Sequence, residues 1–568
     1  MFADPSQEGP QRSTIDSRDC SLLLPDGIKL KARIWTPRHS QGPWPALVMR
    51  QPYGRTIAST VTYAHPSWWA NQGFLVVVQD VRGQGDSGGQ FGGFGQEAAD
   101  TSATLEWVRQ LPDCNGRIGL YGFSYQGFTQ LLAEAHTAPP DCLAPAMTGL
   151  DERDHWSCEG GAHWWHLGLG WGLQLAALQA QRRDDAGAWD EIRRCLEQNR
   201  HYREGLDLLR RHDPDGMALR WLQQSPDDDV AWICHQPSEA WLRQPMLLIG
   251  GWWDPHLRGV LDLHRRSLEQ DGTPELHIGP ATHLEWWPEA QQLHLDFFRR
   301  HLIEARSSSA LGEMQPATSP RLIQVWDQCL QRWSAVSNAD PQGGAWRLTG
   351  SALTCHDPSD GQLVAASAQN SALNAAHPAQ PDPRIGHTPV VIVHDPWRAV
   401  PALGGHLSPI PGPCDRKSLD RRNDVATFTS PPLTTNLTLR GRPVLTLTSW
   451  ADQPGYDLCI ALSVCPASGN QVQQLSTGVR RILGDQALHP TTYAVELQAL
   501  EAQLKPGDQL RLSVAGACWP AIAINPGHRD APCGAPNHTC RVISIHAELE
   551  TAELHFDPLI APLDPPDR

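Results

Sequence analysis

The chain has 568 residues, 40% hydrophobic and 19% charged, a composition typical of a folded protein with several domains. Its formal net charge is -16 without a basic run, which argues against nucleic acid as a partner, because phosphate binding depends on clustered Lys and Arg. No apolar run reaches the ~18 residues of a membrane span, and residues 1–8 lack the pattern of a secretory signal, so we expect a cytoplasmic protein that does not enter membranes.

The cysteines and histidines give no clear metal site. Fourteen cysteines are scattered without a C-x-x-C pair, so we expect free, mostly buried thiols. Cys533 and Cys540 flank a loop of Gly, Pro and Asn, where a disulfide stays an alternative. His163 and His166 have a spacing that could ligate a metal, but aromatic packing is preferred because no third ligand is evident. We expect no metal and no cofactor.

Strands and helices alternate through the first part of the chain. Residues 21–37 predict a β-hairpin, and residues 97–111 have the apolar spacing of a helix. Residues 45–49 and 73–80 predict short buried strands. The glycine-rich residues 81–89 differ from G-x-G-x-x-G at a helix start, so a loop is favoured over a nucleotide site. This alternation predicts a mostly parallel sheet covered on both faces.

The strongest local signal surrounds Ser124. An apolar run at residues 118–121 predicts a strand, Gly122 and Gly127 bracket the serine, and residues 125–136 are compatible with a helix. A strand, a tight turn and a helix lift a serine hydroxyl above the carboxyl edge of a sheet. The spacing here is G-x-S-x-x-G rather than the usual G-x-S-x-G, and an ordinary Gly-Ser loop is the alternative.

From about residue 151 the pattern changes to tryptophans among Ala, Leu, Gln, Arg and Glu. Residues 191–211 and 217–224 predict helices, and no strand is convincing. We therefore predict a helical cap at residues 144–235, inserted into the first domain.

The sheet pattern resumes after this insertion. Residues 244–249 and 274–279 predict strands, and residues 288–301 predict a helix. The α/β domain is therefore predicted to be discontinuous, at residues 1–143 and 236–320.

The last part of the chain is predicted to be all-β, at residues 321–568. A polar connector rich in Ala and Pro occupies residues 367–383. The short alternating runs, punctuated by Gly, Pro and Asn, are typical of a sandwich, a jelly roll or a relative; they lie at residues 321–326, 390–393, 444–448, 458–464, 509–514 and 542–549.

Three residues have the order of a serine-hydrolase triad. Such an enzyme needs a base for the serine proton and a carboxylate to orient that base. Ser124, Asp254 and His283 each follow a predicted strand, in the order serine, acid, histidine. Asp254 precedes a proline, so turn initiation is its alternative role. His256 and His277 are less suited as the base, because one is close to the acid in sequence and the other lies within a strand.

Acyl transfer also needs hydrogen-bond donors for the oxyanion. The backbone N–H of Tyr125, directly after the nucleophile, is placed for one. The loop at residues 50–55 should supply the second, but it lacks an H-G-G-G run. It contains Tyr53, for which a phenolic donor and a packed aromatic are equal alternatives.

Several segments share a pattern with a known family. In the first half they are Pro52-Tyr-Gly54, Asp80-Val-Arg-Gly-Gln-Gly-Asp-Ser-Gly88, Cys114-Asn-Gly-Arg117, Gly122-Phe-Ser-Tyr-Gln-Gly127, Gly251-Trp-Trp-Asp254 and Gly279-Pro-Ala-Thr-His283. In these segments the chain resembles the cocaine esterase / X-prolyl dipeptidyl-peptidase family of serine hydrolases. Residues 394–405, 422–430 and 506–514 are similar to the jelly-roll domain of that family.

This resemblance implies an α/β-hydrolase core, a helical cap and a jelly roll, with the site where the three meet. It also implies that the phenol of Tyr53 and the amide of Tyr125 form the oxyanion hole. One departure is Phe123, where relatives often carry a small residue.

The leading functional prediction is hydrolysis of an ester or amide of a small acyl substrate through an acyl-enzyme on Ser124. Tryptophans are expected to line an apolar acyl pocket. The residues chosen for that pocket are Trp156, Trp164, Trp165 and Trp253. A homo-oligomer is compatible with the sequence.

Two alternatives remain. An X-prolyl or amino-acyl peptidase, or an α-amino-acid ester hydrolase, would need a carboxylate to hold the substrate ammonium. The candidates at the start of the cap are Asp151, Glu152, Asp154 and Glu159, although acidic residues also favour ordinary helix N-termini. A catalytically dead, ligand-binding scaffold is the alternative outside the enzymes.

Overall fold

A computed structural model of the protein describes residues 15–37, 40–56, 62–304, 323–336, 341–366, 389–530 and 539–560. The predicted connector at residues 367–383 and Cys533 lie outside these ranges, so the connector and the alternative bridge to Cys540 stay predictions. Six of the described cysteines are buried, Cys142 and Cys195 among them, and seven are partly exposed, so the expectation of mostly buried thiols is not confirmed.

The first domain is built on a ten-stranded sheet with the order β1-β2-β4-β3-β5-β6-β9-β10-β11-β12. The hairpin β1–β2 is antiparallel, as predicted, and the strands from β4 to β10 pair in parallel. The bounds of the first eight are β1 (Ile15–Leu23), β2 (Lys29–Pro37), β3 (Trp44–Gln51), β4 (Leu75–Asp80), β5 (Cys114–Phe123), β6 (Cys142–Ala146), β9 (Leu247–Trp253) and β10 (Glu275–Thr282).

Helices cover both faces of this sheet, as its alternating pattern predicts. One apolar cluster includes Leu105 from α2 and Val260 from α9, and the other includes Trp69 from α1 and Phe297 from α10. The helices of this domain are α1 (Pro66–Asn71), α2 (Glu97–Arg109), α3 (Tyr125–Phe128), α8 (Glu239–Leu242), α9 (Leu257–Glu269) and α10 (Ala290–Phe298), which a π-helix (Arg299–Glu304) continues.

The helix expected over residues 125–136 is much shorter. It is the single turn α3, because side chains engage the backbone groups that a longer helix would need. The carbonyl of Gln130 accepts the indole N–H of Trp241 at 2.8 Å, and the backbone N–H of Glu134 donates to the hydroxyl of Ser102 at 2.8 Å.

The cap contains four helices, α4 (Trp165–Arg182), α5 (Ala186–Glu197), α6 (His201–His212) and α7 (Met217–Gln223). The single helix predicted over residues 191–211 is wrong, because the chain breaks at Asn199, whose φ of 53° is left-handed. The helix predicted over residues 217–224 is confirmed by α7. A short hairpin, β7 (Cys158–Glu159) and β8 (Ala162–His163), which the sequence did not predict, opens the cap.

The strand predicted at residues 321–326 belongs to a different sheet than expected. It is β11 (Ile323–Asp327), which pairs in parallel with β10, and β12 (Arg332–Val336) follows it at the edge. Its alternating pattern suits either sheet, and pairing with β10 buries Ile323 and Val325 in the core of the first domain. The expectation that this strand starts the all-β domain is therefore corrected.

The C-terminal domain is all-β, as predicted, and forms a nearly closed barrel. Its strand path is β19-β18-β22-β16-β14-β13-β23-β17-β20, with β15 beside β23 and β21 beside β17. The strands are β13 (Trp346–Thr349), β14 (Gln362–Ala365), β15 (Val390–His394), β16 (Val425–Thr429), β17 (Leu437–Ala451), β18 (Gly455–Cys465), β19 (Gln473–Leu483), β20 (Thr491–Glu496), β21 (Leu500–Leu504), β22 (Gln509–Ala515) and β23 (Ile543–Asp557).

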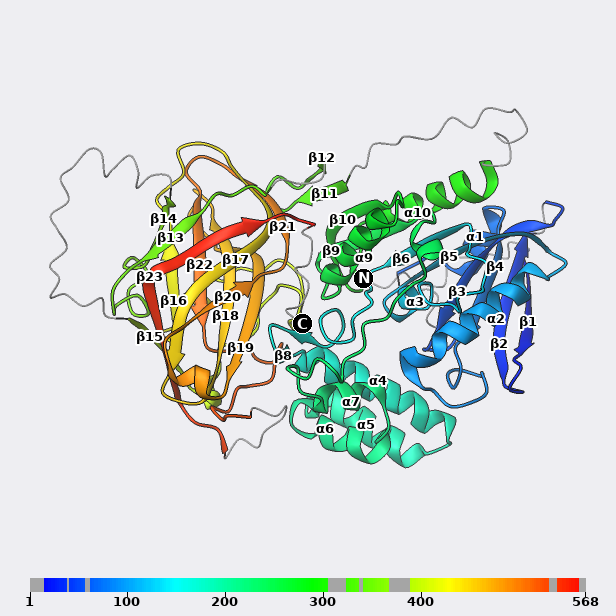
Figure 1. The fold of residues 1–568 in the computed structure, drawn as a ribbon, viewed down its shortest axis with the longest axis horizontal. Coiled ribbons are helices and arrows are strands. Elements are labelled where there is room, and N and C mark those ends of the chain that lie inside the picture. The colour runs from blue at the N-terminus through cyan, green and yellow to red at the C-terminus, as the bar shows by residue number, and fades with distance from the viewer. Residues whose placement is uncertain are drawn as a thin grey trace.

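The three parts meet at the carboxyl edge of the first sheet. In Figure 1 the β domain is on the left, the α/β domain on the right, and helices α4–α7 lie below the junction. The amide of Gln498, from the β domain, donates to the carbonyl of Asp254 at 2.8 Å. Gln179 of α4 donates to the carbonyl of Gly83 at 2.9 Å, so the glycine-rich loop holds the cap.

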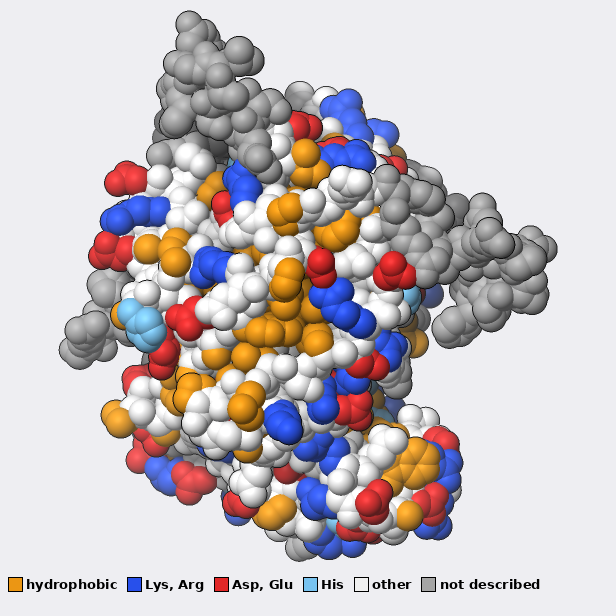
Figure 2. Space-filling model, turned by 90° about the vertical axis from the view of Figure 1, so that its right-hand side faces the viewer, with side chains coloured by type: hydrophobic (Ala, Val, Ile, Leu, Met, Phe, Trp, Pro, Cys, Tyr) orange, Lys and Arg blue, Asp and Glu red, His pale blue; other side chains and the backbone are white. Residues whose placement is uncertain are grey.

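The outer face of the molecule at the α/β end is mixed in character. Figure 2 shows Lys and Arg interspersed with Asp and Glu around a central group of hydrophobic side chains. Within the part of the chain that the structure describes, no helix is long and apolar enough to cross a lipid bilayer.

Candidate active site

Ser124 lies in a strained turn at the end of β5. Its φ of 57° and ψ of -129° are unusual for a residue with a side chain, and its N–H is held by the carbonyl of Ala146 at 3.0 Å. Gly122 is required because a Cβ there would lie 2.5 Å from the Cβ of Gln126. A Cβ on Gly127 would lie 2.9 Å from the carbonyl oxygen of Ala146, so the displaced second glycine allows α3 to pack on β6.

Asp254 and His283 follow the adjacent parallel strands β9 and β10. Nδ1 of His283 lies 2.6 Å from Oδ1 of Asp254, and the carboxylate is fully buried. The imidazole ring packs on the ring of Phe123 with centroids 5.2 Å apart, which brings it to the turn of Ser124. With Nδ1 bonded to the carboxylate, Nε2 remains to accept a proton.

The other histidines do not share this geometry. Nδ1 of His256 lies 2.7 Å from the carbonyl of His155, and burial lowers the pKa of His256 to about 4. Burial also lowers the pKa of His277, a residue of β10, to about 4. Neither has a hydrogen bond from its ring to Asp254 among the described contacts.

The described residues include one group with a geometry that could hold a metal ion, and it lies at the same place. In the described ranges, the ligand atoms of Asp254, His256 and His283 lie within 4.8 Å of one another, and two of these residues already share the 2.6 Å hydrogen bond. The pair His163 and His166 points to other partners. The ring of His163 bonds to the carbonyl of Gln224 at 2.9 Å, and His166 bonds to the hydroxyl of Tyr202 at 2.8 Å.

Tyr53 lies beside Ser124. Burial raises the pKa of its phenol to about 12, while hydrogen bonds with Trp171 and Ser124 oppose the rise. The indole N–H of Trp171 donates to the phenol oxygen at 3.0 Å, and the backbone N–H of Tyr53 donates to Gln51 at 2.8 Å. Trp171 was not among the tryptophans predicted for the pocket, and it lies two turns into α4.

Tyr125 is the first residue of α3, where a backbone N–H has no intrahelical partner. Its amide is therefore free of the helix ladder next to Ser124. Its phenol is fully buried and donates to Glu97 at 2.8 Å. Burial, followed by the charge of Glu97, raises the pKa of the Tyr125 phenol well above its ordinary value.

The four tryptophans predicted for the pocket are divided. The ring centroids of Trp156 and Trp164 lie 4.4 and 5.7 Å from that of His256, so both reach the loop that carries Asp254. Trp165 instead belongs to the apolar core of the cap. Trp253 is half-buried and packs against the core of the α/β domain.

Most carboxylates at the start of the cap already have hydrogen-bond partners within the protein. Glu152 is buried, accepts from Arg220 at 2.6 Å and from the indole of Trp221 at 2.9 Å, and lies 3.1 Å from His235. Burial alone would raise the pKa of Glu152, but these hydrogen bonds bring it below its ordinary value.

The other three acidic residues differ from one another. Asp151 accepts the backbone N–H groups of two following residues, and Asp154 pairs with Arg153 at 3.3 Å. Glu159 pairs with His406 of the β domain at 2.6 Å, and its second oxygen, Oε1, is buried without a hydrogen-bond partner.

Sequence comparisons match both halves of the chain. Residues 26–285 match X-Pro dipeptidyl-peptidase (S15 family), and residues 327–553 match the X-Pro dipeptidyl-peptidase C-terminal non-catalytic domain. The cocaine esterase of Rhodococcus sp. (strain MB1 Bresler) is 23% identical over 552 residues, which cover 89% of this chain and 92% of that protein. Fold and matches together define a serine hydrolase with an α/β-hydrolase domain.

The chain belongs to the X-Pro dipeptidyl-peptidase (S15) family, because the two matched segments together span most of its length. Solved structures share the whole architecture. An aminopeptidase from a marine sediment archaeon, Thaumarchaeota archaeon, has a TM-score of 0.68 at 19% identity and covers 98% of this chain and 99% of its own. An α-amino acid ester hydrolase has a TM-score of 0.65 at 17% identity, with 98% of both chains covered. At these identities the likeness shows the fold.

Proposed function

We propose that the protein cleaves an ester or amide bond of a small acyl substrate through an acyl-enzyme on Ser124. The observation that carries the proposal is the 2.6 Å hydrogen bond between His283 and the buried Asp254, beside a serine held in a strained turn. His283 takes the Oγ proton as Ser124 attacks the carbonyl, and returns it to the leaving group. In the second half of the reaction His283 takes a proton from water, which attacks the acyl carbonyl, and returns that proton to Oγ of Ser124 as the acid leaves.

The phenol of Tyr53 and the amide of Tyr125 are proposed to bind the oxyanion. The hydrogen bond between the phenol and Ser124 supports this role, because it places the phenol beside the hydroxyl that attacks the carbonyl. Its hydrogen bond from Trp171 supports it further, since that bond occupies a lone pair of the oxygen and leaves the O–H to donate elsewhere.

The acyl group is proposed to be uncharged and apolar or aromatic. Trp156 and Trp164 approach the loop of Asp254, and His256 between them and the base is neutral at pH 7. Such walls favour flat apolar groups. Buried free thiols, such as those of Cys142 and Cys195, fit a cytoplasmic setting.

A second candidate is an amino-acyl ester hydrolase or peptidase. It is favoured by one observation, the buried and unpartnered Oε1 of Glu159, which could accept a hydrogen bond from a substrate ammonium. Glu152 does not support it, because its oxygens are already bonded within the cap.

A fluorophosphonate probe tests the nucleophile directly. We expect labelling of the wild type at Ser124 and none of Ser124→Ala, and a folded wild type that resists labelling would point to the ligand-binding scaffold. A panel of p-nitrophenyl esters against amino-acyl and prolyl anilides then tests the substrate. Preference for the anilides, lost in Glu159→Gln, would favour the second candidate.

A further inference from the structure

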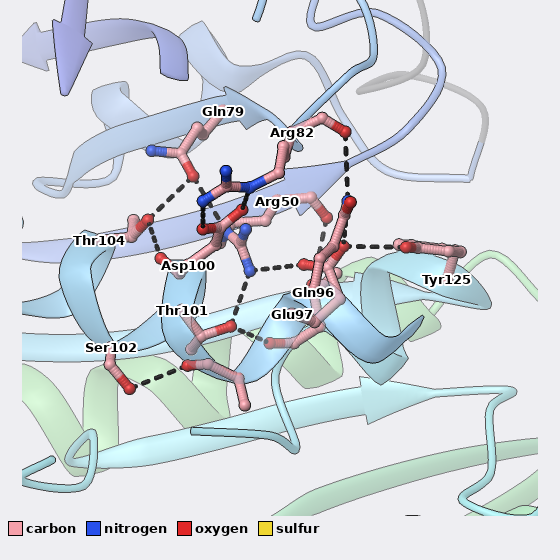
Figure 3. Close-up of polar contacts among 12 residues, drawn as sticks. Arg50, Gln79, Arg82, Gln96, Glu97, Asp100, Thr101, Ser102, Thr104 and Tyr125 are labelled. Carbon is pink, nitrogen blue, oxygen red and sulfur yellow. Dashed lines mark hydrogen bonds and ion pairs between the residues drawn. The ribbon is translucent and has the colours of Figure 1, made fainter. Parts of the chain in front are cut away.

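A buried polar network adjoins the nucleophile turn (Figure 3). At its centre is Glu97, the first residue of α2, which is completely buried. One carboxylate oxygen accepts the phenol of Tyr125 at 2.8 Å, and the other accepts Nη1 of Arg50 at 2.7 Å. The carboxylate therefore bridges two segments that are far apart in sequence.

Arg50 lies near the carboxyl end of β3, three residues before Tyr53. Its side chain is 4% exposed and also donates to Gln79 at 2.9 Å and to Thr101 at 2.7 Å. Both of these partners are neutral. Among the described ion pairs, Glu97 is the carboxylate that balances this buried guanidinium.

The two segments joined by Glu97 are the start of α3 and the end of β3. They lead to the two donors proposed for the oxyanion. The phenol of Tyr125 is anchored on Glu97, and its amide is the donor beside Ser124. The carbonyl of Arg50 accepts the hydroxyl of Thr129, just past α3, at 3.2 Å. The backbone continues from Arg50 directly into the loop of Tyr53. The end of β3 is therefore connected to the turn of Ser124 and Tyr125 through both the side chain and the carbonyl of Arg50.

We propose that Glu97 is a positioning residue for the oxyanion hole. It holds Tyr125 through its phenol and the start of the Tyr53 loop through Arg50, and it touches neither substrate nor reacting atoms. The inference rests on the proposed function, because it presupposes that Tyr53 and Tyr125 stabilise an oxyanion.

The physical reason is the cost of movement inside a buried network. A shift of Tyr125 would leave a buried carboxylate oxygen without its phenol donor, and a shift of Arg50 would separate two buried charges. Oxyanion donors act only when they are aimed at the place where the charge develops. A network that resists movement therefore preserves that aim.

Two variants test this role. Tyr125→Phe removes one phenol oxygen, and Glu97→Gln removes the charge while it keeps the shape. For each we expect kcat with a p-nitrophenyl ester to fall about 10- to 100-fold, with KM changed by less than about threefold, because misplaced donors weaken the transition state selectively. The inhibition constant of phenylboronic acid, whose serine adduct is tetrahedral and anionic, should rise by the same factor as kcat/KM falls.

A matched ion pair separates positioning from stability. Glu501 in the β domain is 4% exposed and binds Arg440 through two hydrogen bonds of 2.6 and 2.8 Å. Glu501→Gln should lower the melting temperature while kcat and boronate inhibition stay unchanged. Folded Tyr125→Phe with kcat and boronate inhibition within about twofold of the wild type, well short of the expected loss, would overturn the inference even if Glu97→Gln does not fold.

The outcome also distinguishes this inference from the proposed function. A wild type that neither turns over esters nor reacts with the fluorophosphonate overturns both. A wild type that does so, with variants that lose only melting temperature, overturns the positioning role alone.

Discussion

The α/β domain and the cap contribute to the site in different ways. In the α/β domain the candidate groups follow the ends of β5, β9 and β10, parallel strands of one sheet with β6 between β5 and β9, so the backbone itself brings Ser124, Asp254 and His283 to one edge. In the cap the residues come from helices and loops, and packing decides which tryptophans reach the edge. Trp156 does so, and Trp165 is buried in the cap core. The residues proposed for the reaction can therefore be recognised in short sequence motifs, whereas the residues that line the pocket cannot.

The largest expected effect tests the α/β side of this comparison. Ser124→Ala should lower kcat by about 10⁴-fold or more, because the nucleophile is lost. The melting temperature should change little, since only one oxygen is removed. Ester turnover and thermal unfolding check this. More than a few per cent of wild-type turnover, in a preparation free of other esterases, would contradict the assignment.

The next effect concerns Tyr53, whose proposed role as an oxyanion donor is not a requirement of the α/β-hydrolase fold. Tyr53→Phe removes one oxyanion donor, which costs about 10²- to 10³-fold in kcat. KM should change much less, because the hydrogen bond strengthens as the carbonyl oxygen gains charge. The matched control is Tyr121→Phe, in which the lost hydroxyl is buried without a hydrogen-bond partner. Equal kcat in the two variants would leave Tyr53 as a packed aromatic.

A pair of tryptophan variants tests the cap side. Trp156→Leu should raise KM for an aromatic acyl ester about tenfold relative to an acetyl ester, because an aromatic contact is lost. Trp165→Leu should lower the melting temperature without changing that ratio, since Trp165 packs within the cap core. Steady-state kinetics with both esters decide the matter. If the ratio of the two KM values were the same in both variants, Trp156 could not be distinguished from a residue of the cap core.

The last prediction concerns stability against acid rather than catalysis. Burial lowers the pKa of His294 to about 4, so the folded protein keeps it neutral while the unfolded chain takes up a proton below about 6.5. Its contribution to stability is therefore present above about pH 6.5 and is lost as the pH falls toward about 4, with a slope of at most about 1.4 kcal/mol per pH unit.

His294→Phe should flatten this dependence, because an aromatic ring replaces the buried imidazole among aromatic neighbours. His136→Phe is the control, since its side chain is 71% exposed. Unfolding free energies measured between pH 4.5 and 7 compare the two. Parallel curves for His294→Phe and the wild type would show that another group governs the acid sensitivity.

The three-part organisation of the chain and the strand ends that carry the proposed chemistry can be predicted from the sequence alone. Glycines around Ser124 and apolar runs before Asp254 and His283 are local features, and the parallel strands of one sheet bring them to the same edge. The hairpin at the start, the helical insertion and the all-β end were also visible, because their periodicities differ.

The remaining features depend on contacts between residues that are far apart in the chain. The fold places β11 in the first sheet, and the sequence could not show this, because an alternating strand can pair with the edge of either sheet. The structure also shows that Glu152 is bonded within the cap and that Trp171 donates to Tyr53. Burial and hydrogen-bond partners come from residues far apart in the chain, so no local pattern contains them. The bridge from Tyr125 through Glu97 to Arg50 is of this kind.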